Sequence, residues 1–171
     1  CNFSYRDSLF KNNPHLMITK VCLDLSNTFK PNTQYESLPK KVINAKEQRQ
    51  NILNIRSLKL PNHKIVPNVG SFFKNPVISE SKLDELVIKF PNIKSYLFKK
   101  NRYKVSAAWL IEEAGLKGSK KGECGISDLH SLVFYNFSDQ SDFLVTYSLE
   151  VKDIIEEKFG IILDYEPSIF S

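Results

Sequence analysis

GSFFKNP, residues 70–76, is the stretch on which the fold assignment of this 171-residue chain depends. Its apolar residues follow neither the two-residue period of a strand nor the 3.6-residue period of a helix. The glycine at one end and the Asn-Pro pair at the other are typical of a turn. A turn that holds a hydroxyl, an amine, an amide and two adjacent aromatic rings is a candidate functional loop, although Phe72 and Phe73 taken alone indicate core positions.

Hydrophobic periodicity on either side of this turn predicts a mixture of helices and strands. Helices are expected at 41–58, 81–90, 106–114 and 141–159, and strands at 16–25, 131–136 and 161–165. Ser81 and Ser106 are the expected N-caps of the two middle helices, and Gly160 is the expected end of the last one. Because strands and helices interleave, the fold class is α+β or α/β, and we favour α+β.

The composition is that of an ordinary globular chain. With 42% hydrophobic and 25% charged residues, the chain is able to bury a core, as one domain or as two small ones. It has no apolar run long enough to span a membrane and no visible signal peptide, so we expect no membrane partner and a cytoplasmic location. The net charge of +5 comes from lysines that are spread along the chain without a recognition motif or a basic stripe, which argues against a nucleic-acid partner.

The three cysteines are an odd number and lack the C-x-x-C spacing of a zinc site. They argue against a metal site and a disulfide framework, and for a reducing compartment. Cys1 fits either the lipidated first residue of a processed lipoprotein or a chain that begins within a longer protein, and we favour the second explanation.

Several polar residues are candidates for chemistry, and each also has an ordinary structural explanation. Ser71 is either a turn former or a proton carrier, because no neighbouring His or Asp completes a nucleophile triad. Arg6 is either half of a salt bridge with Asp7 or the guanidinium partner of a bound carboxylate. The other candidates, which by type are surface, packing or capping residues, are Tyr35, Lys59, Tyr96 and His130. From these residues alone the sequence indicates an α/β domain, with an anion as one option for its ligand.

Taken together, several segments occur in the order and spacing of one known family. They are YRDSLFK (5–11), the segment around Tyr35, LKLP (58–61), NVGSFFKNPV (68–77), AAWLIEEAGLKG (107–118) and YEPSI (165–169). With these segments the chain resembles the MurB family of UDP-N-acetylenolpyruvoylglucosamine reductases from Cys1 to Ser171. The combination of GSFFKNP with the A-x-W-L-I segment carries the resemblance, and Tyr96 matches the form of the family that has a tyrosine-bearing loop.

This resemblance implies an NADPH-dependent, FAD-mediated reduction of UDP-N-acetylglucosamine enolpyruvate to UDP-N-acetylmuramate for peptidoglycan. Arg6 is expected to stabilise the enolate that develops beside the substrate carboxylate, and Ser71 to protonate the enolic carbon, with both facing the edge of the flavin. Phe72 and Phe73 are expected to position the turn. The residues that match substrate-binding positions, which serve the diphosphate and the uridine, are Tyr35, Lys59, Asn75, Tyr96 and His130.

Two departures from the family pattern matter. The family carries a glutamate directly after a Glu-Pro pair near its C-terminus, where it assists the arginine and the serine, and here that catalytic position is Ser168. Glu166 lies two residues earlier and would face the same side in an extended strand. The second departure is that most of the family's FAD-binding half lies N-terminal to YRDS and is missing here.

The missing half leads to an expected division of the chain. Residues 1–58 are expected to be the tail of an FAD-binding domain, and 59–160 a small α/β substrate-binding domain. Residues 161–171 are expected to form a strand that returns to the missing N-terminal FAD-binding segment. The chain is then a piece of an active reductase. The alternative, which Ser168 and the missing half favour, is a catalytically dead remnant that only binds UDP-sugar.

Overall fold

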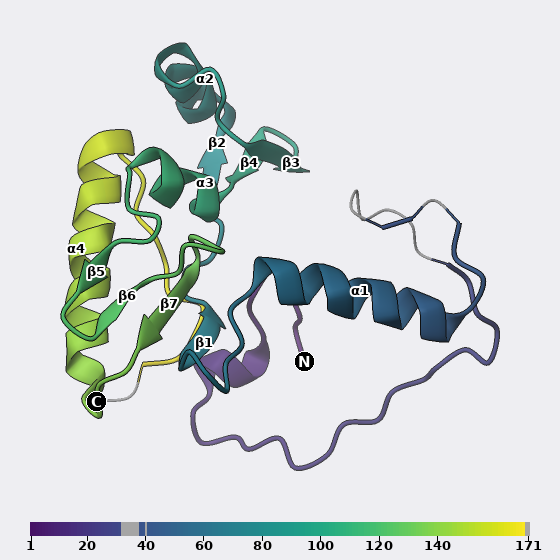
Figure 1. Cartoon of the computed structure of the whole chain (residues 1–171). Helices are drawn as coiled ribbons and strands as arrows, with labels where there is room; N and C mark the ends of the chain where they lie inside the picture. The colour runs from purple at the N-terminus through teal and green to yellow at the C-terminus, as the bar shows by residue number, and fades with distance from the viewer. Residues whose placement is uncertain (32–37, 40, 170–171) are drawn as a thin grey trace. The chain divides into compact units, whose positions relative to one another are not determined.

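The computed structural model of the protein describes residues 1–31, 38–39 and 41–169 (Figure 1). The chain divides into two compact units, Cys1–Arg56 and Ser57–Ser171. Within the described part of the first unit, Leu38 is the one buried hydrophobic side chain, whereas the second unit contains the core.

The first unit contributes the start of one long helix, α1 (Ala45–Lys59). Asn44 caps this helix, because its Oδ1 accepts a hydrogen bond from the Glu47 N–H at 2.9 Å. The Glu47 carboxylate in turn accepts a hydrogen bond from the Ile43 N–H at 2.8 Å. The helix expected at 41–58 is therefore confirmed, with a later start that the cap determines.

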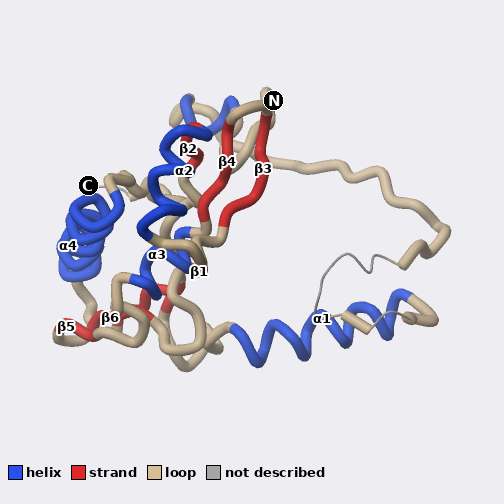
Figure 2. The backbone as a smooth tube through the Cα atoms, turned by 90° about the horizontal axis from the view of Figure 1, so that it is seen from above, coloured by secondary structure: helices blue, strands red, loops and turns tan. Residues whose placement is uncertain are grey.

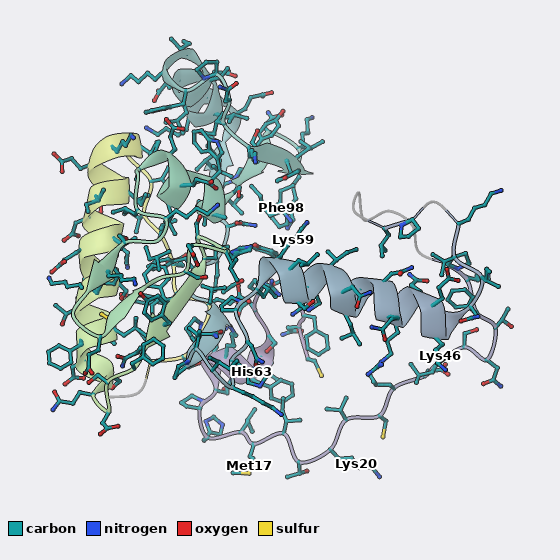
Figure 3. All side chains as sticks on the ribbon, viewed as in Figure 1. Met17, Lys20, Lys46, Lys59, His63 and Phe98 are labelled. Atoms are coloured by element: carbon teal, nitrogen blue, oxygen red, sulfur yellow. The ribbon has the colours of Figure 1, made fainter. Side chains whose placement is uncertain are left out.

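The strand expected at 16–25 is wrong. After the short 3₁₀ helix η1 (Leu9–Asn12), the chain runs through this segment without regular structure. Figure 3 shows the Met17 and Lys20 side chains on this stretch, and Met17 is 85% exposed. A strand needs a neighbour for its backbone hydrogen bonds, and none of the described residues pairs with this segment. The segment has the β-branched and aliphatic side chains of a strand, but the described chain contains no partner strand for it.

Beyond the end of α1, the described part of the second unit is built from two small sheets and three helices (Figure 2). One sheet has the order β1-β7-β6-β5, formed by Asn68–Ser71, Val133–Asn136, Cys124–Ile126 and Lys120–Lys121. The other has the order β2-β4-β3, formed by Val77–Ser79, Arg102–Val105 and Ser95–Lys99. The helices are α2 (Glu80–Lys89), α3 (Ala107–Glu113) and α4 (Ser141–Phe159).

All strand pairs among the described residues are antiparallel. The α+β class is therefore confirmed. The description of the second domain as α/β is wrong, because that architecture needs parallel strands joined by helical crossovers.

The three helices of the second unit lie where periodicity predicts them. Ser106 caps α3 as expected, since its Oγ accepts a hydrogen bond from the Trp109 N–H at 3.2 Å. Gly160 ends α4 as expected, in the left-handed conformation with φ 62°. The cap of α2 is Ser79 and not Ser81, because the Ser79 Oγ accepts from the N–H of the third residue along the helix at 3.2 Å.

The core lies between the β1-β7-β6-β5 sheet and helices α3 and α4. Its largest members are aromatic: Phe72 and Phe73 are 3% and 0% exposed and pack with Phe134 of β7. Their expected role as core residues is confirmed. No helix in the described part of the chain is both long enough and apolar enough to cross a bilayer.

The 70–76 stretch begins as a strand and continues as irregular chain with one isolated bridge at Phe73. Gly70 and Ser71 end β1, so the prediction of a turn throughout is wrong. Between Asn68 and Ser71, β1 advances three residues while β7 advances two, which is a β-bulge, and Gly70 supports it with a φ of 79°. The bulge removes the alternation that would have indicated a strand.

Candidate active site

The backbone of Ser71 to Lys74 is tied to other parts of the second unit on both sides. On one side Ser71 pairs with Val133 of β7, and the Phe72 N–H donates to the Leu132 carbonyl at 2.9 Å. On the other side the Lys74 N–H donates to the Asp164 carbonyl at 2.8 Å. On this same side the Glu166 N–H donates a hydrogen bond to the Phe72 carbonyl at 3.0 Å. These bonds hold the motif between β7 and the segment that follows α4.

The strand expected at 161–165 has only part of its predicted structure. Ile161 and Leu163 are buried, and Tyr165 forms a single antiparallel bridge with Phe73. No longer ladder forms among the described residues. The bridge is enough to bring the C-terminal segment beside the Ser71 motif.

Ser71 lies on the sheet face that points away from α4. Phe134 packs toward α4, with its ring centroid 6.1 Å from that of Tyr147. Side chains alternate along a strand, so Val133 faces the other way, and Ser71 shares its face because directly paired residues do. A Cβ placed on the neighbouring Gly70 would meet no described atom within 4 Å. The backbone beside Ser71 is therefore open to close approach by a ligand.

The surroundings of His130 favour its neutral imidazole. Burial lowers its pKa below the ordinary 6.5, the positive charge of Lys117 lowers that pKa further, and Glu112 opposes the shift. A smaller lowering comes from Lys59, so this expected substrate residue belongs to the same electrostatic environment. The His130 Nδ1 accepts a hydrogen bond from the Leu132 N–H at 3.2 Å. In the neutral ring Nε2 then carries the hydrogen and is available as a donor.

The other predicted residues of the second unit lie in separate elements. Asn75 points its Oδ1 at α3, where it accepts from the Ala107 N–H at 2.9 Å. Tyr96 is 60% exposed on β3 and lies opposite Lys104 of β4. Ser168 is exposed on the irregular segment that follows the Phe73–Tyr165 bridge.

Two predicted residues are outside this unit. Arg6 belongs to the first unit, at a tight turn in which the Ser4 N–H donates to the Asp7 carbonyl at 3.0 Å. Its φ of 54° is unusual for a residue with a side chain. Tyr35 lies outside the described residues.

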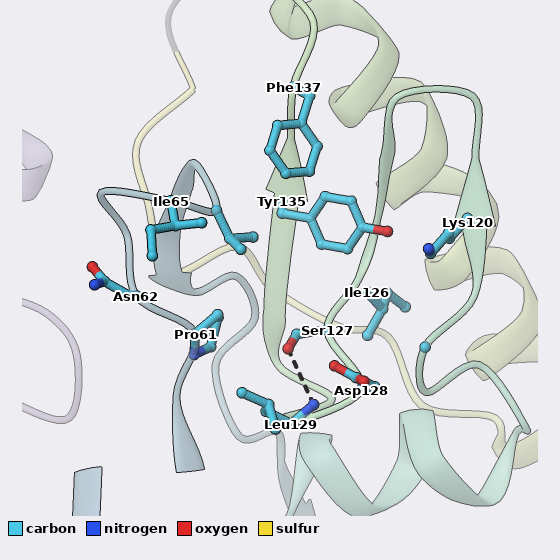
Figure 4. A pocket seen from close by; sticks show the side chains of 12 residues that line it. Pro61, Asn62, Ile65, Lys120, Ile126, Ser127, Asp128, Leu129, Tyr135 and Phe137 are labelled. Atoms are coloured by element: carbon cyan, nitrogen blue, oxygen red, sulfur yellow. Dashed lines mark hydrogen bonds between the residues drawn. The ribbon is translucent and has the colours of Figure 1, made fainter. Parts of the chain in front are cut away.

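A hollow of about 610 Å³ opens on the outer face of the same sheet (Figure 4). Tyr135 of β7 lies in it, with its hydroxyl over Gly125 of β6, where a Cβ would stand 2.6 Å from the hydroxyl oxygen. Lys120 and Asp128 supply charges of opposite sign at its wall. None of these residues is among the candidate site residues expected from the sequence. The signal that could have identified Tyr135 is its place next to buried Phe134 in the expected strand 131–136, because side chains alternate between the two faces of a strand.

A family model and individual relatives of this chain carry the same name. Residues 60–170 match the family model described as UDP-N-acetylenolpyruvoylglucosamine reductase, C-terminal domain. The chain belongs to this reductase family. A curated reductase of that name from Shewanella oneidensis is 37% identical over 175 residues, which cover 99% of this chain and 51% of the relative.

Two further reductases show the same coverage. Those from Flavobacterium johnsoniae and Pseudomonas putida are 36% and 33% identical, and each match covers 99% of this chain and 53% of the relative. The chain thus spans about half the length of the curated reductases it matches.

Proposed function

We propose that this chain is the substrate-binding part of an FAD-dependent reductase that uses NADPH to convert UDP-N-acetylglucosamine enolpyruvate to UDP-N-acetylmuramate. The observation that carries the proposal is the Ser71 motif, because its hydroxyl lies on the face away from the core and its backbone is held on both sides. Membership of the reductase family supports the same conclusion.

The proposed chemistry divides between the cofactor and the protein. FAD, when bound, supplies the hydride for the vinyl carbon of the substrate, and NADPH renews it. The open backbone at Gly70 fits the approach of a flat ring to this strand end. Ser71 then donates the proton to the neighbouring carbon, and Arg6 stabilises the negative charge that develops there. A serine is a weak acid, so a fixed position beside the reacting carbon is essential to its role.

The proposed nucleotide-sugar site uses residues that present donors or positive charge. Lys59 serves the diphosphate, and His130 donates from Nε2, because its pKa is lowered and it remains neutral. Asn75 offers its amide hydrogens, since its oxygen is committed to α3. Tyr96 is exposed and free to turn toward the uridine. Tyr35 completes the proposed set.

The proposal also assigns a role to each part of the chain. Residues 1–58 are the tail of the FAD-binding region, and the run of exposed apolar side chains at 16–25 supports this role, because such a surface requires a covering partner. Residues 59–160 form the substrate-binding domain. Residues 161–171 lead back toward the FAD-binding region, after their first five residues pass the Ser71 motif.

A second candidate function is a remnant that binds UDP-sugar without reducing it. The observation that favours it is Ser168, which has a hydroxyl where the family has a carboxylate. Glu166 is the nearest carboxylate along this segment, and its backbone N–H bonds to the Phe72 carbonyl beside Ser71.

One experiment separates the two candidates. The chain is supplied with FAD, NADPH and the enolpyruvyl nucleotide, binding is measured by calorimetry, and NADPH oxidation is followed by its absorbance. Substrate-dependent oxidation that Ser71→Ala abolishes establishes the reductase. Binding without oxidation, with or without a flavin-binding half from a relative, establishes the remnant. Absence of binding refutes both.

A further inference from the structure

Tyr165 makes contacts in several directions at the point where the C-terminal segment crosses the Ser71 motif. Its ring stacks on Phe73 with centroids 5.4 Å apart and planes at 20°, and it meets the edge of Phe72 at 5.6 Å. The Lys152 Nζ of α4 lies 4.7 Å from the ring centroid. The Tyr165 hydroxyl lies 3.0 Å from the Ser148 Oγ, also on α4.

The direction of this last hydrogen bond is determined by its neighbours. Ser148 is fully buried, and its hydroxyl hydrogen is donated to the Val145 carbonyl at 2.6 Å. A serine hydroxyl has one hydrogen, so the Ser148 Oγ acts as the acceptor and the Tyr165 hydroxyl as the donor. Tyr165 is therefore anchored to the rigid helix at its tip and to the motif's phenylalanines through its ring.

The backbone bonds on either side of Tyr165 are the ones that hold the motif. The Asp164 carbonyl accepts from the Lys74 N–H, and the Glu166 N–H donates to the Phe72 carbonyl. Both bonds depend on the position of the residue between them. We propose that Tyr165 is a positioning residue that holds Ser71 in place for proton donation, an inference that rests on the proposed function.

A general packing role predicts a different outcome from a positioning role. If Tyr165 only fills space, its substitution lowers the stability of the whole unit equally. If it positions the motif, loss of the hydroxyl loosens residues 72–74 while the remaining elements keep their protection. Tyr165→Phe separates the two, because it keeps the ring contacts and removes only the bond to Ser148.

The test is residue-resolved hydrogen exchange on the full chain, with Tyr103→Phe as the matched control. Tyr103 lies on β4 and donates its hydroxyl to the Glu80 carboxylate at 3.3 Å, away from the motif. In Tyr165→Phe, the amides of Lys74 and Glu166 are expected to exchange about five- to tenfold faster, the factor for one lost hydrogen bond. The Ala114 amide of the α3 C-terminus, bonded to the Leu110 carbonyl, is expected not to change.

Ser148→Ala removes the acceptor instead of the donor and is expected to speed the same two amides. Uniform acceleration across the unit, or no acceleration at Lys74 and Glu166, would overturn the proposal. In the reductase assay, Tyr165→Phe is expected to lower kcat several-fold with KM unchanged and to raise the solvent isotope effect, because proton transfer becomes slower. Unchanged kcat and isotope effect with accelerated exchange would also overturn it.

The two levels of inference fail separately. Absence of substrate binding and turnover by the unmodified chain refutes the proposed function before any variant is compared. The exchange measurement needs no substrate. It therefore tests whether Tyr165 holds the backbone of the motif in place, whether or not the chain binds and turns over the substrate.

Discussion

Asn75 offers the sharpest separation of folding from ligand binding in this protein. Its Oδ1 accepts a hydrogen bond from the Ala107 N–H at 2.9 Å, and Ala107 is fully buried at the start of α3. The amide nitrogen on the other side of the group is the proposed donor to the nucleotide sugar. One side chain therefore has a structural side and a binding side.

Two substitutions act on these sides differently. Asn75→Ala removes the acceptor and leaves a buried N–H unpaired, which costs about 1–3 kcal/mol of unfolding free energy. Asn75→Asp keeps an acceptor for Ala107, and its charge near the first turn of a helix changes stability by only about 0.3–1 kcal/mol in the favourable direction. Ligand binding is affected differently from stability. The aspartate of Asn75→Asp has no amide donor, and its negative charge repels a diphosphate. We expect Asn75→Asp to weaken binding about tenfold or more.

The assay combines urea unfolding of both variants with calorimetric titration of the enolpyruvyl nucleotide. The expected result is a folded, stable Asn75→Asp protein that binds poorly. If Asn75→Asp is destabilised as much as Asn75→Ala, the bond to Ala107 is not what Asn75 contributes to the fold. If Asn75→Asp binds as tightly as the parent, Asn75 is not a substrate-binding residue.

Three further predictions concern other parts of the second unit. Ser79→Ala is expected to lower the unfolding free energy by about 1 kcal/mol, whereas Ser81→Ala leaves it nearly unchanged, because Ser79 is the N-cap of α2; equal losses in urea titrations contradict this. His130→Gln is expected to flatten the pH dependence of stability. In the parent, the pKa of His130 is below 6.5 in the folded state, so the unfolded chain binds more protons than the folded chain near and below pH 6.5. The contribution of His130 to the unfolding free energy is therefore fully present above pH 6.5 and is lost as the pH falls through the folded-state pKa. Identical pH profiles for parent and variant refute the assignment. Phe73→Ala is expected to cost about 3–5 kcal/mol, against under 1 kcal/mol for the exposed Phe143→Ala; a loss below about 1 kcal/mol for Phe73→Ala contradicts the aromatic core.

Local signals in the sequence predicted the helices and their ends well. Amphipathic periodicity placed α2, α3 and α4, Ser106 was recognised as a cap, and Gly160 as a terminator. The motif residues were identified by resemblance, and Phe72 and Phe73 by their type. These features depend on residues within one or two turns of each other, so the sequence contains them directly.

Strands were predicted less well, because each depends on a distant partner. The bulge at Gly70 disguised β1, and β2, β5 and β6 have only two or three residues, too few for an alternating pattern. The segment 16–25 has the composition of a strand and no partner among the described residues. The choice of Ser79 over Ser81 as a cap was likewise settled by where β2 ends and the helix begins.

The amino-acid sequence by itself determined the family, the helical elements and the residue types that the proposed chemistry needs. Only the tertiary structure decided which of these residues meet: Ser71 beside the backbone of Glu166, Asn75 on the start of α3, and His130 near lysine charges that lower its pKa. The physical reason is sequence separation. Contacts between residues that are 13 to 94 positions apart depend on how whole elements pack, and no local pattern of side chains records that packing.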